Sequence, residues 1–139
     1  MPQQPESAAR IRICKVDETM VDKKIRVAGR VIAYNSHTGL AVLLDGKFGL
    51  LVDTDLSLDE ESSDWATERL ATVVTMGHLE RSEQPLAVPL MPAHAPPVAI
   101  NRELVLRAIL IVRSPDLDLK LWNSVLEEEE EYQESKVKH

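Results

Sequence analysis

The chain of 139 residues has little sulfur and few aromatic side chains: Cys14 is its one cysteine, and aromatic residues make up 4%. A single cysteine excludes a disulfide framework and is typical of a reducing compartment. With so few aromatic rings, any core has to be aliphatic. The apolar runs fall far short of the ~20 residues that a membrane-spanning helix needs, and residues 1–5 lack the pattern of a signal peptide. We therefore expect a soluble, intracellular protein.

Catalytic and metal-binding patterns are also missing. The sequence has no phosphate-binding loop, no dinucleotide-binding glycine pattern, and no cysteine or histidine pairs at the spacing of a zinc site. The four histidines are scattered, and we expect ordinary surface or hydrogen-bonded side chains at His37, His78, His94 and His139. We therefore predict that the chain is not an enzyme and holds no cofactor and no metal.

The chain has no excess of positive charge, and its formal net charge is −7. Residues 1–113 carry 13 basic and 15 acidic side chains, whereas residues 114–139 carry 3 and 8. The acidity therefore belongs mostly to the C-terminal part, and the body is close to neutral. Because strong nucleic-acid binders neutralise many phosphates with lysine and arginine, any such binding here is expected to be weak or shared with a partner.

What the chain does have is enough apolar material, 44% of its residues, for one core. We predict a disordered lead over residues 1–10, one domain over 11–133 and a flexible tail over 134–139. Alternating or continuous apolar stretches predict five strands, at 24–34, 40–44, 47–54, 70–80 and 103–113.

The connections and the last strand add further expectations. Turn sequences join the first three strands into a meander, and 56–68 is expected to form a loop with a helical turn. Five prolines make 81–101 a long loop. The last strand is apolar over 104–106 and 108–112, too continuously for a strand with one face in water.

This order of elements predicts an all-β fold with a terminal helix: the five-stranded Greek-key barrel of the OB-fold, followed by a C-terminal α-helix. So small a barrel curves strongly, and its first strand has to bend to serve both sheets. Gly29 and Gly77 lie within the first and fourth strands, where a residue without a side chain permits a bulge or kink. The alternative is that they are only weak points in flat strands.

A helix is predicted from the Ser-Pro-Asp sequence at 114–116 onward, because proline suits a first turn and acidic residues suit its dipole. It carries two adjacent apolar rows, which are more than packing on one side of a small domain requires. One row can cover the barrel while the other meets a partner helix, and tryptophan is favoured at binding hot spots. The alternative is that both rows are buried within the domain. The predicted partner-interface residues are Leu117, Leu119, Leu121, Trp122, Val125, Leu126 and Tyr132.

A second candidate surface is a face of the barrel. Period-two alternation places Arg26, Arg30 and Tyr34 on one side of the first strand, with Lys47 and Phe48 after the following hairpin. Arginine pairs with phosphate and tyrosine stacks on bases, so these five residues are the predicted nucleic-acid contacts. The alternative is an ordinary exposed surface with a few basic residues.

Two stretches of the chain resemble the fungal small subunit of the CST telomere-capping complex. The first is Lys-Ile-Arg-Val-Ala-Gly-Arg-Val at 24–31, followed by Tyr34, Thr38-Gly39 and Leu-Val-Asp at 51–53. The second is Leu-Arg-Ala-Ile-Leu-Ile-Val at 106–112, followed by Ser-Pro-Asp-Leu-Asp-Leu at 114–119. The resemblance covers roughly residues 10–133.

The small subunit of replication protein A is similar in the same places, through Thr38-Gly39, Asp45-Gly46 and Asp-Leu-Lys-Leu-Trp-Asn at 118–123. This subunit, a scaffold of the heterotrimer in DNA replication and repair, is the alternative identity. An autonomous nucleic-acid binder and an adaptor unrelated to nucleic acid are the other possibilities.

The CST resemblance implies an OB-fold that heterodimerises with a larger OB-fold subunit through the C-terminal helix. It also implies an assembly that binds the single-stranded G-rich telomere overhang and regulates telomerase and fill-in synthesis by polymerase alpha–primase. The small subunit itself contributes little base reading in that family. The implied location is the nucleus, at telomeres of the chromosome.

Overall fold

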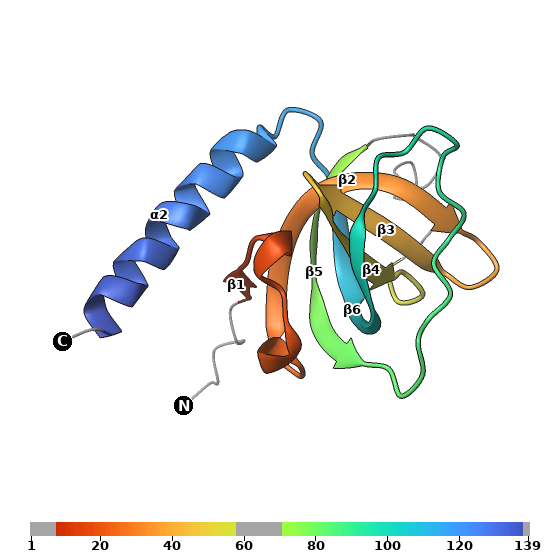
Figure 1. Ribbon diagram of the computed structural model, residues 1–139, viewed down its shortest axis with the longest axis horizontal. Helices are drawn as coiled ribbons and strands as arrows, with labels where there is room; N and C mark the ends of the chain where they lie inside the picture. Colours follow the sequence, from red (N-terminus) through yellow and green to blue (C-terminus); the bar gives the residue numbers. More distant parts are fainter. Residues whose placement is uncertain (1–7, 58–70, 138–139) are drawn as a thin grey trace.

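The computed structural model describes residues 8–57 and 71–137. Five strands curl into a barrel, and one long helix stands beside it (Figure 1). The strands are β2 (Lys24–Asn35), β3 (Leu40–Asp45), β4 (Phe48–Asp53), β5 (Thr72–Arg81) and β6 (Ala99–Arg113). The helix is α2 (Leu119–Val137). Ahead of the barrel come the short strand β1 (Ala9–Arg10) and two 3-10 turns, η1 (Ile13–Lys15) and η2 (Glu18–Met20).

The strand pairings close the sheet on itself. β2, β3 and β4 form an antiparallel meander. β4 then pairs in parallel with β6, β6 pairs antiparallel with β5, and β5 returns to pair antiparallel with β2. Closure of this kind protects strand edges from pairing with other chains. The predicted fold class is confirmed: a five-stranded OB-fold-like barrel with a C-terminal helix.

β2 changes its partner in mid-strand. Residues 24–30 pair with β5, and residues 30–35 pair with β3. Just before the change, a Cβ atom at Gly29 would lie only 2.8 Å from the Cδ1 atom of Ile13. A register shift between Val31 and Ala33 then makes Ile32 an extra residue and reverses the alternation of side chains beyond it. The predicted bend of the first strand is therefore present, as a bulge that follows Gly29.

The second predicted irregularity lies at Gly77 in β5. The register of β5 against β6 shifts between Met76 and Gly77. A Cβ atom at Gly77 would overlap the backbone carbonyl group of Arg107 on β6. The missing side chain therefore lets the two backbones approach closely where the barrel turns.

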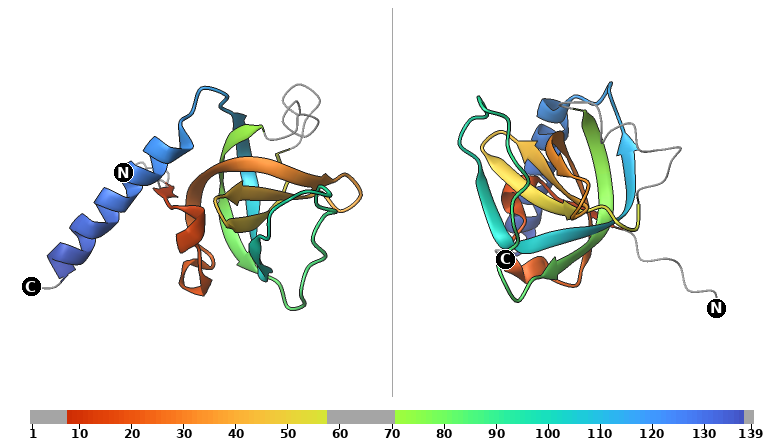
Figure 2. Two further views of the ribbon diagram at one scale, coloured as in Figure 1. Left: turned by 45° about the horizontal axis from the view of Figure 1, so that its top comes forward. Right: turned by 90° about the vertical axis from the view of Figure 1, so that its right-hand side faces the viewer.

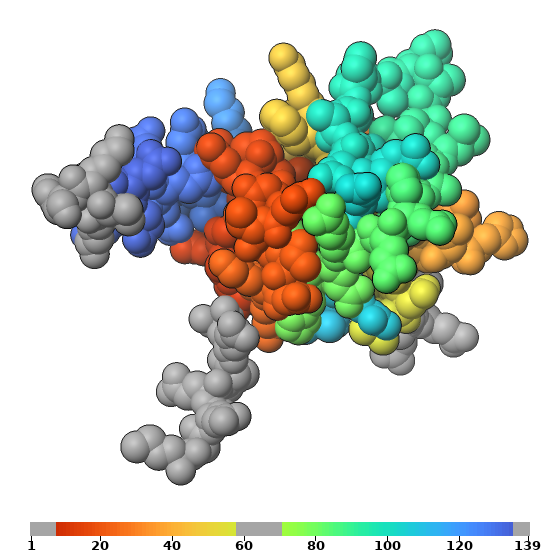
Figure 3. Space-filling view, turned by 60° about the horizontal axis from the view of Figure 1, so that its bottom comes forward, coloured from red at the N-terminus to blue at the C-terminus, as the bar shows by residue number. Residues whose placement is uncertain are grey.

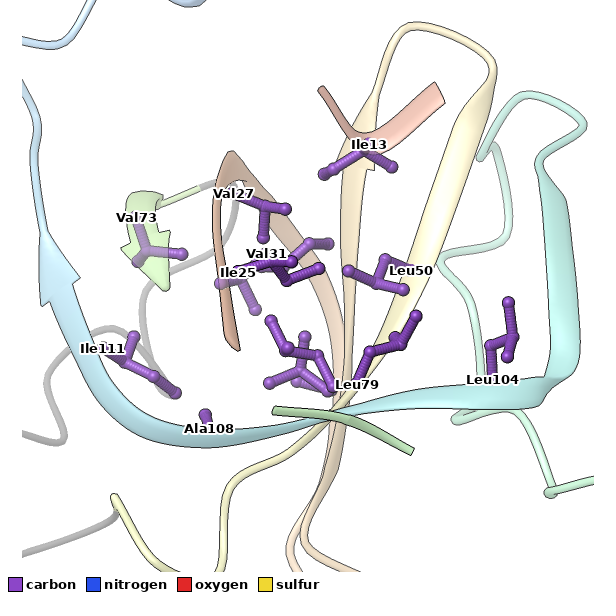
Figure 4. Packing of buried hydrophobic residues seen from close by; sticks show 14 of the residues in the cluster. Ile13, Ile25, Val27, Val31, Leu50, Val73, Leu79, Leu104, Ala108 and Ile111 are labelled. Atoms are coloured by element: carbon purple, nitrogen blue, oxygen red, sulfur yellow. The ribbon is translucent and has the colours of Figure 1, made fainter. Parts of the chain in front are cut away.

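Aliphatic side chains from all five strands fill the barrel, and Figure 4 shows most of them. The N-terminal segment closes one end, because Ile13 of η1 is buried within this interior cluster and Met20 and Val21 pack against it. In Figure 3 the red and orange N-terminal residues lie between the blue helix and the green strand β5. Residues 8–23 are thus partly a plug for the barrel and partly a spacer between barrel and helix.

Both ends of the fold extend further than predicted. The sequence predicts disorder over residues 1–10, but Ala9 and Arg10 form β1 and pair in parallel with β2. The structure differs from the prediction at these two residues, because a two-residue strand has no periodic signal of its own; residues 1–7 lie outside the described residues. The helix continues to Val137, past the predicted domain end at 133. It begins at Leu119 instead of 114, because the Asp118 carboxylate caps it by accepting a hydrogen bond of 3.1 Å from the Leu121 backbone N–H.

The proline-rich loop is shorter than the predicted 81–101. β5 continues through Arg81, and β6 begins at Ala99, which pairs with Phe48 of β4. The loop therefore covers residues 82–98. The segment predicted as loop with a helical turn, 56–68, lies outside the described residues apart from its first two positions.

Candidate functional site

The structure separates the two apolar rows of α2. Leu126 is 2% exposed, and Leu119 and Trp122 are half-buried on the side that faces the domain. Leu121, Val125 and Tyr132 are 61%, 41% and 59% exposed. Leu117 is half-buried in the turn before the helix. Six of the seven predicted interface residues thus lie on α2 in two rows. The inner row, which packs on this domain, is Leu119, Trp122 and Leu126. The outer row, which the chain leaves exposed, is Leu121, Val125 and Tyr132.

Polar contacts hold the inner side of α2 in place. Near its start, Asn123 Nδ2 donates a hydrogen bond of 2.8 Å to Asp45 Oδ2 at the end of β3. Near its middle, Arg10 of β1 forms an ion pair of 2.9 Å with Glu129. The helix is therefore fixed at two levels although it extends well beyond the barrel (Figure 1), and its outer row has a defined direction.

The strongest of these contacts joins Arg12 to Glu130. The guanidinium donates from Nε to Oε1 at 3.0 Å and from Nη2 to Oε2 at 2.6 Å. This hydrogen bonding, followed by the positive charges of Arg12 and Lys15, lowers the pKa of the Glu130 carboxyl from its ordinary value of 4.5, although burial opposes the change. The same bonding raises the pKa of the Arg12 guanidinium. Two-point pairing of this kind fixes orientation as well as distance.

We expect Glu130→Gln to lower the free energy of unfolding by about 1 kcal/mol at neutral pH, because a charge-assisted pair that is partly exposed to solvent is lost. A carboxyl whose pKa is lowered by folding stabilises the protein above its unfolded pKa and loses that effect as the pH falls through the folded value. The difference between wild type and variant should therefore shrink as the pH falls below 4.5 and through the lowered pKa of Glu130. Urea unfolding followed by circular dichroism at several pH values measures it.

Glu129→Gln is the matched control, because the Arg10–Glu129 pair is about half exposed on both sides. Such surface pairs contribute little, so this variant should unfold nearly as the wild type does. Equal destabilisation by the two substitutions at neutral pH would contradict the special role of Arg12–Glu130.

A shallow groove runs between the N-terminal segment and the helix. Ile11, Val125, Leu126 and Tyr132 line it, and Arg10 and several glutamates form its rim. It joins the outer row to the plug segment, so a helix packed against Val125 would also meet Ile11. Apolar walls with a charged rim suit protein association better than a small polar ligand.

The five predicted nucleic-acid contacts do not share one surface. Arg26 and Arg30 are exposed on the outside of β2. Tyr34 instead packs against the interior cluster, because the bulge at Ile32 reverses the direction of the residues beyond it. The prediction that alternation unites Tyr34 with the two arginines is therefore wrong. A nucleic-acid role for any of these residues stays a prediction.

Lys47 and Phe48 lie elsewhere again. Lys47 is exposed in the β3–β4 turn. Phe48 lines a pocket at the plugged end of the barrel, together with Ile13 and Cys14 of the N-terminal segment. Phe48 therefore faces a pocket at the end of the barrel, whereas the two arginines lie on the outer face of β2.

The outer face of β3 and β4 is covered by the proline-rich loop. Val42 and Leu51, which point out of the barrel, are fully buried together with Leu40 and Val105. The loop supplies the cover: Leu86, Val88 and Met91 pack against this second cluster. Figure 2 shows the loop following the outside of the barrel wall. This cover was not predicted from the sequence, although the apolar residues interspersed among the prolines are a signal for it.

Arg102 fastens the loop to β6. Its Nε donates a hydrogen bond of 2.7 Å to the Leu86 carbonyl, and the Leu86 N–H donates one of 2.9 Å to the Arg102 carbonyl. OB-folds bind oligonucleotides on the face of their second and third strands, which here are β3 and β4. In this chain that face is occupied by its own loop.

Val88→Asp should lower the free energy of unfolding by about 2 kcal/mol, because the charge removes apolar cover from the second cluster. The matched control is Leu90→Asp two residues later, since Leu90 is 95% exposed and should tolerate the change. Urea unfolding compares the variants, and hydrogen exchange of β3 and β4 amides reports the cover directly. If both substitutions act alike, the loop does not seal this face.

Potential metal-ligating side chains are dispersed in the part of the chain that the structure describes. No group of three or more histidine, cysteine, aspartate or glutamate side chains there is placed to hold a metal ion. No helix within residues 8–57 and 71–137 is long and apolar enough to cross a bilayer. The candidate features that the geometry provides are surfaces: the outer row of α2 with its groove, and the walls of the barrel.

Solved structures share this barrel and helix. A chain of the S. pombe Stn1–Ten1 complex matches with a TM-score of 0.64 and 17% identity, over 94% of this chain and 98% of its own. The S. pombe telomere capping protein Ten1 matches with a TM-score of 0.61 and 17% identity, over 90% of this chain and 99% of its own.

A putative aspartyl-tRNA synthetase from Leishmania major matches with a TM-score of 0.53 and 16% identity, over 84% of this chain but 23% of the synthetase. No family model and no curated protein matches the sequence. The structure is thus similar to Ten1 over most of the chain. At these identities the likeness establishes the fold, and the function has to be argued from the surfaces.

Proposed function

We propose that this chain is the small, non-enzymatic OB-fold subunit of a telomeric single-stranded-DNA-binding complex of the CST type. It heterodimerises with a larger OB-fold subunit through α2, and the assembly caps chromosome ends and regulates telomere replication. The observation that carries the proposal is the outer row Leu121, Val125 and Tyr132, exposed on a helix that Arg12 and Asn123 hold in a fixed direction. The likeness to structures of Ten1 and of the Stn1–Ten1 complex, over at least 90% of the chain, supports the choice of assembly.

The surface of the barrel supports a scaffolding role for this chain and not a role as the main DNA-binding subunit. The loop covers the outer face of β3 and β4, and the predicted DNA contacts are dispersed over different parts of the barrel. The body of the chain is close to neutral, so few phosphates can be neutralised. The larger subunit would then read most of the DNA bases, and the small subunit would stabilise it and position the assembly, with polymerase alpha–primase as a further partner.

Co-purification of the tagged chain from its source organism tests the proposal. A larger OB-fold protein together with telomeric factors is the expected result, at nuclear chromosome ends. A set of general replication factors would reject it in favour of the small subunit of replication protein A. Recovery of neither set would favour an adaptor unrelated to nucleic acid.

Titration of the isolated chain with labelled G-rich and mixed single strands at two salt concentrations is the second test. We expect weak binding alone and tight binding only in the complex. Submicromolar binding by the isolated chain, with a steep dependence on salt, would identify an autonomous binder instead.

A further inference from the structure

The outer face of β5 and β6 carries an apolar strip in the middle of the sheet. Val74 and Met76 of β5 lie opposite Val112 and Leu110 of β6. Leu110 and Val112 are 48% and 45% exposed, and Val74 and Met76 are half-buried. The solvent face of an antiparallel sheet normally carries polar residues. These four residues, here called the β5–β6 strip, therefore form an unusual surface for a barrel wall.

The outward-facing apolar residues of β6 are buried in the first half of the strand and exposed in the second half. Val105, in the first half, is buried beneath the proline-rich loop as part of the second cluster. Leu110 and Val112, in the second half, remain exposed. The sequence predicts that the apolar run 108–112 is too continuous for a strand with one face in water, and for the chain alone that prediction is wrong. A cover from another molecule would restore it.

Two arginines follow one side of the strip. On β2, Arg26 lies opposite Met76 and Arg30 lies opposite Thr72. Arg26 Nη2 is 3.8 Å from the Met76 sulfur, so this guanidinium borders the apolar residues directly. Within residues 8–57 and 71–137, Arg10, Arg12, Arg81 and Arg107 form ion pairs, whereas Arg26 and Arg30 form none. The strip is therefore bordered by positive charge that lacks a carboxylate.

The dimensions of the strip suit an α-helix. Two neighbouring strands present a width of about 10 Å, which is close to the diameter of a helix with its side chains. Arg26 and Arg30 are four residues apart on one strand, or about 13 Å, and carboxylates two to three helical turns apart span about 11 to 16 Å.

We propose that the β5–β6 strip docks an amphipathic, acidic α-helix of a protein partner. Its apolar face covers Val74, Met76, Leu110 and Val112, and two of its carboxylates pair with Arg26 and Arg30. Charge complementarity selects an acidic partner, and the aliphatic centre favours a protein over a nucleic acid, which would need aromatic stacking platforms. The described aromatic side chains lie elsewhere: Tyr34 at the interior cluster, Phe48 at the plugged end, and Trp122 and Tyr132 on α2. The proposal does not rest on the function proposed for α2.

A synthetic amphipathic peptide of four helical turns, with leucines on one face and glutamates along its flanks, is the probe. Its binding to the full chain is measured by fluorescence anisotropy and by NMR shifts of methyl groups. Shifts should concentrate at Val74, Met76, Leu110 and Val112. Leu110→Ser, and Arg26→Glu combined with Arg30→Glu, should each weaken binding at least tenfold. These side chains are exposed, so the variants should fold.

The matched controls are Leu90→Ser and Lys47→Glu, which make similar changes at exposed positions off the strip and should leave binding unchanged. Leu121→Glu should also bind the peptide normally, which separates this surface from α2. Equal affinity for a peptide with lysines in place of glutamates, displacement of the peptide by mixed single-stranded DNA, or shifts confined to α2 would overturn the proposal. So would a wild-type dimer in sedimentation that Leu110→Ser converts to monomer, since a second copy would then be the cover.

Discussion

Gly77→Ala should lower the free energy of unfolding by about 3 kcal/mol or more, the largest stability effect that we expect from one added methyl group. The new Cβ atom would overlap the Arg107 carbonyl and crowd the Ala108 Cα atom, both of which belong to the backbone of β6. The backbone of a closed barrel cannot rotate away as a side chain can, so β6 has to move away from β5. The pairing of β5 with β6 is the longest antiparallel pairing of the barrel, so much of the sheet is affected. Thermal unfolding followed by circular dichroism measures the loss, as a shift of about 10 °C.

Gly29→Ala is the matched control, because Gly29 also lies within a strand of the closed barrel. A Cβ atom there first meets the terminal methyl group of Ile13, the far end of a flexible side chain. We expect a cost of about 1 kcal/mol, since Ile13 can shift within the plug. If Gly77→Ala melts no lower than Gly29→Ala, the close approach of β5 and β6 is not the reason for a glycine at position 77.

Leu121→Glu should weaken association with the proposed larger OB-fold subunit by about two orders of magnitude, since loss of an apolar hot spot costs about 2 to 4 kcal/mol. Leu121 is the most exposed residue of the outer row, so the carboxylate remains solvated in the free chain and the barrel should keep its stability. Co-purification and isothermal titration with the co-expressed partner measure the effect. Trp122→Glu is less informative, because Trp122 belongs to the inner row and its change would detach the helix itself.

Lys120→Glu is the control for charge. Lys120 is exposed and points about 100° away from Leu121 around the helix. Its charge change is larger than that of Leu121→Glu, yet partner binding should change little. If both variants bind the partner as the wild type does, α2 is not the interface and the proposed heterodimer has to form elsewhere.

The two apolar rows of α2 were predictable from the local pattern of the sequence. Recurrence every three to four residues predicted two apolar rows, and the structure buries one and exposes the other. Period-two alternation gave the wrong face for β2 residues beyond Val31, because one inserted residue reverses every side chain that follows it. It also missed the pairing of Arg12 with Glu130, which are brought together only by the docking of α2.

The amino-acid sequence by itself determined the elements and their class: five strands, a long loop stiffened by proline, and a terminal helix with more apolar surface than one small domain needs. These follow from periodicity and turn chemistry, which act over a few residues. Only the tertiary structure decided that Tyr34 turns toward the barrel core. It also decided that Leu86, Val88 and Met91 cover the outside of β3 and β4. Finally, it decided that Leu110 and Val112 remain exposed to solvent. Those outcomes depend on which distant segments meet and in what register, and no local pattern contains that information.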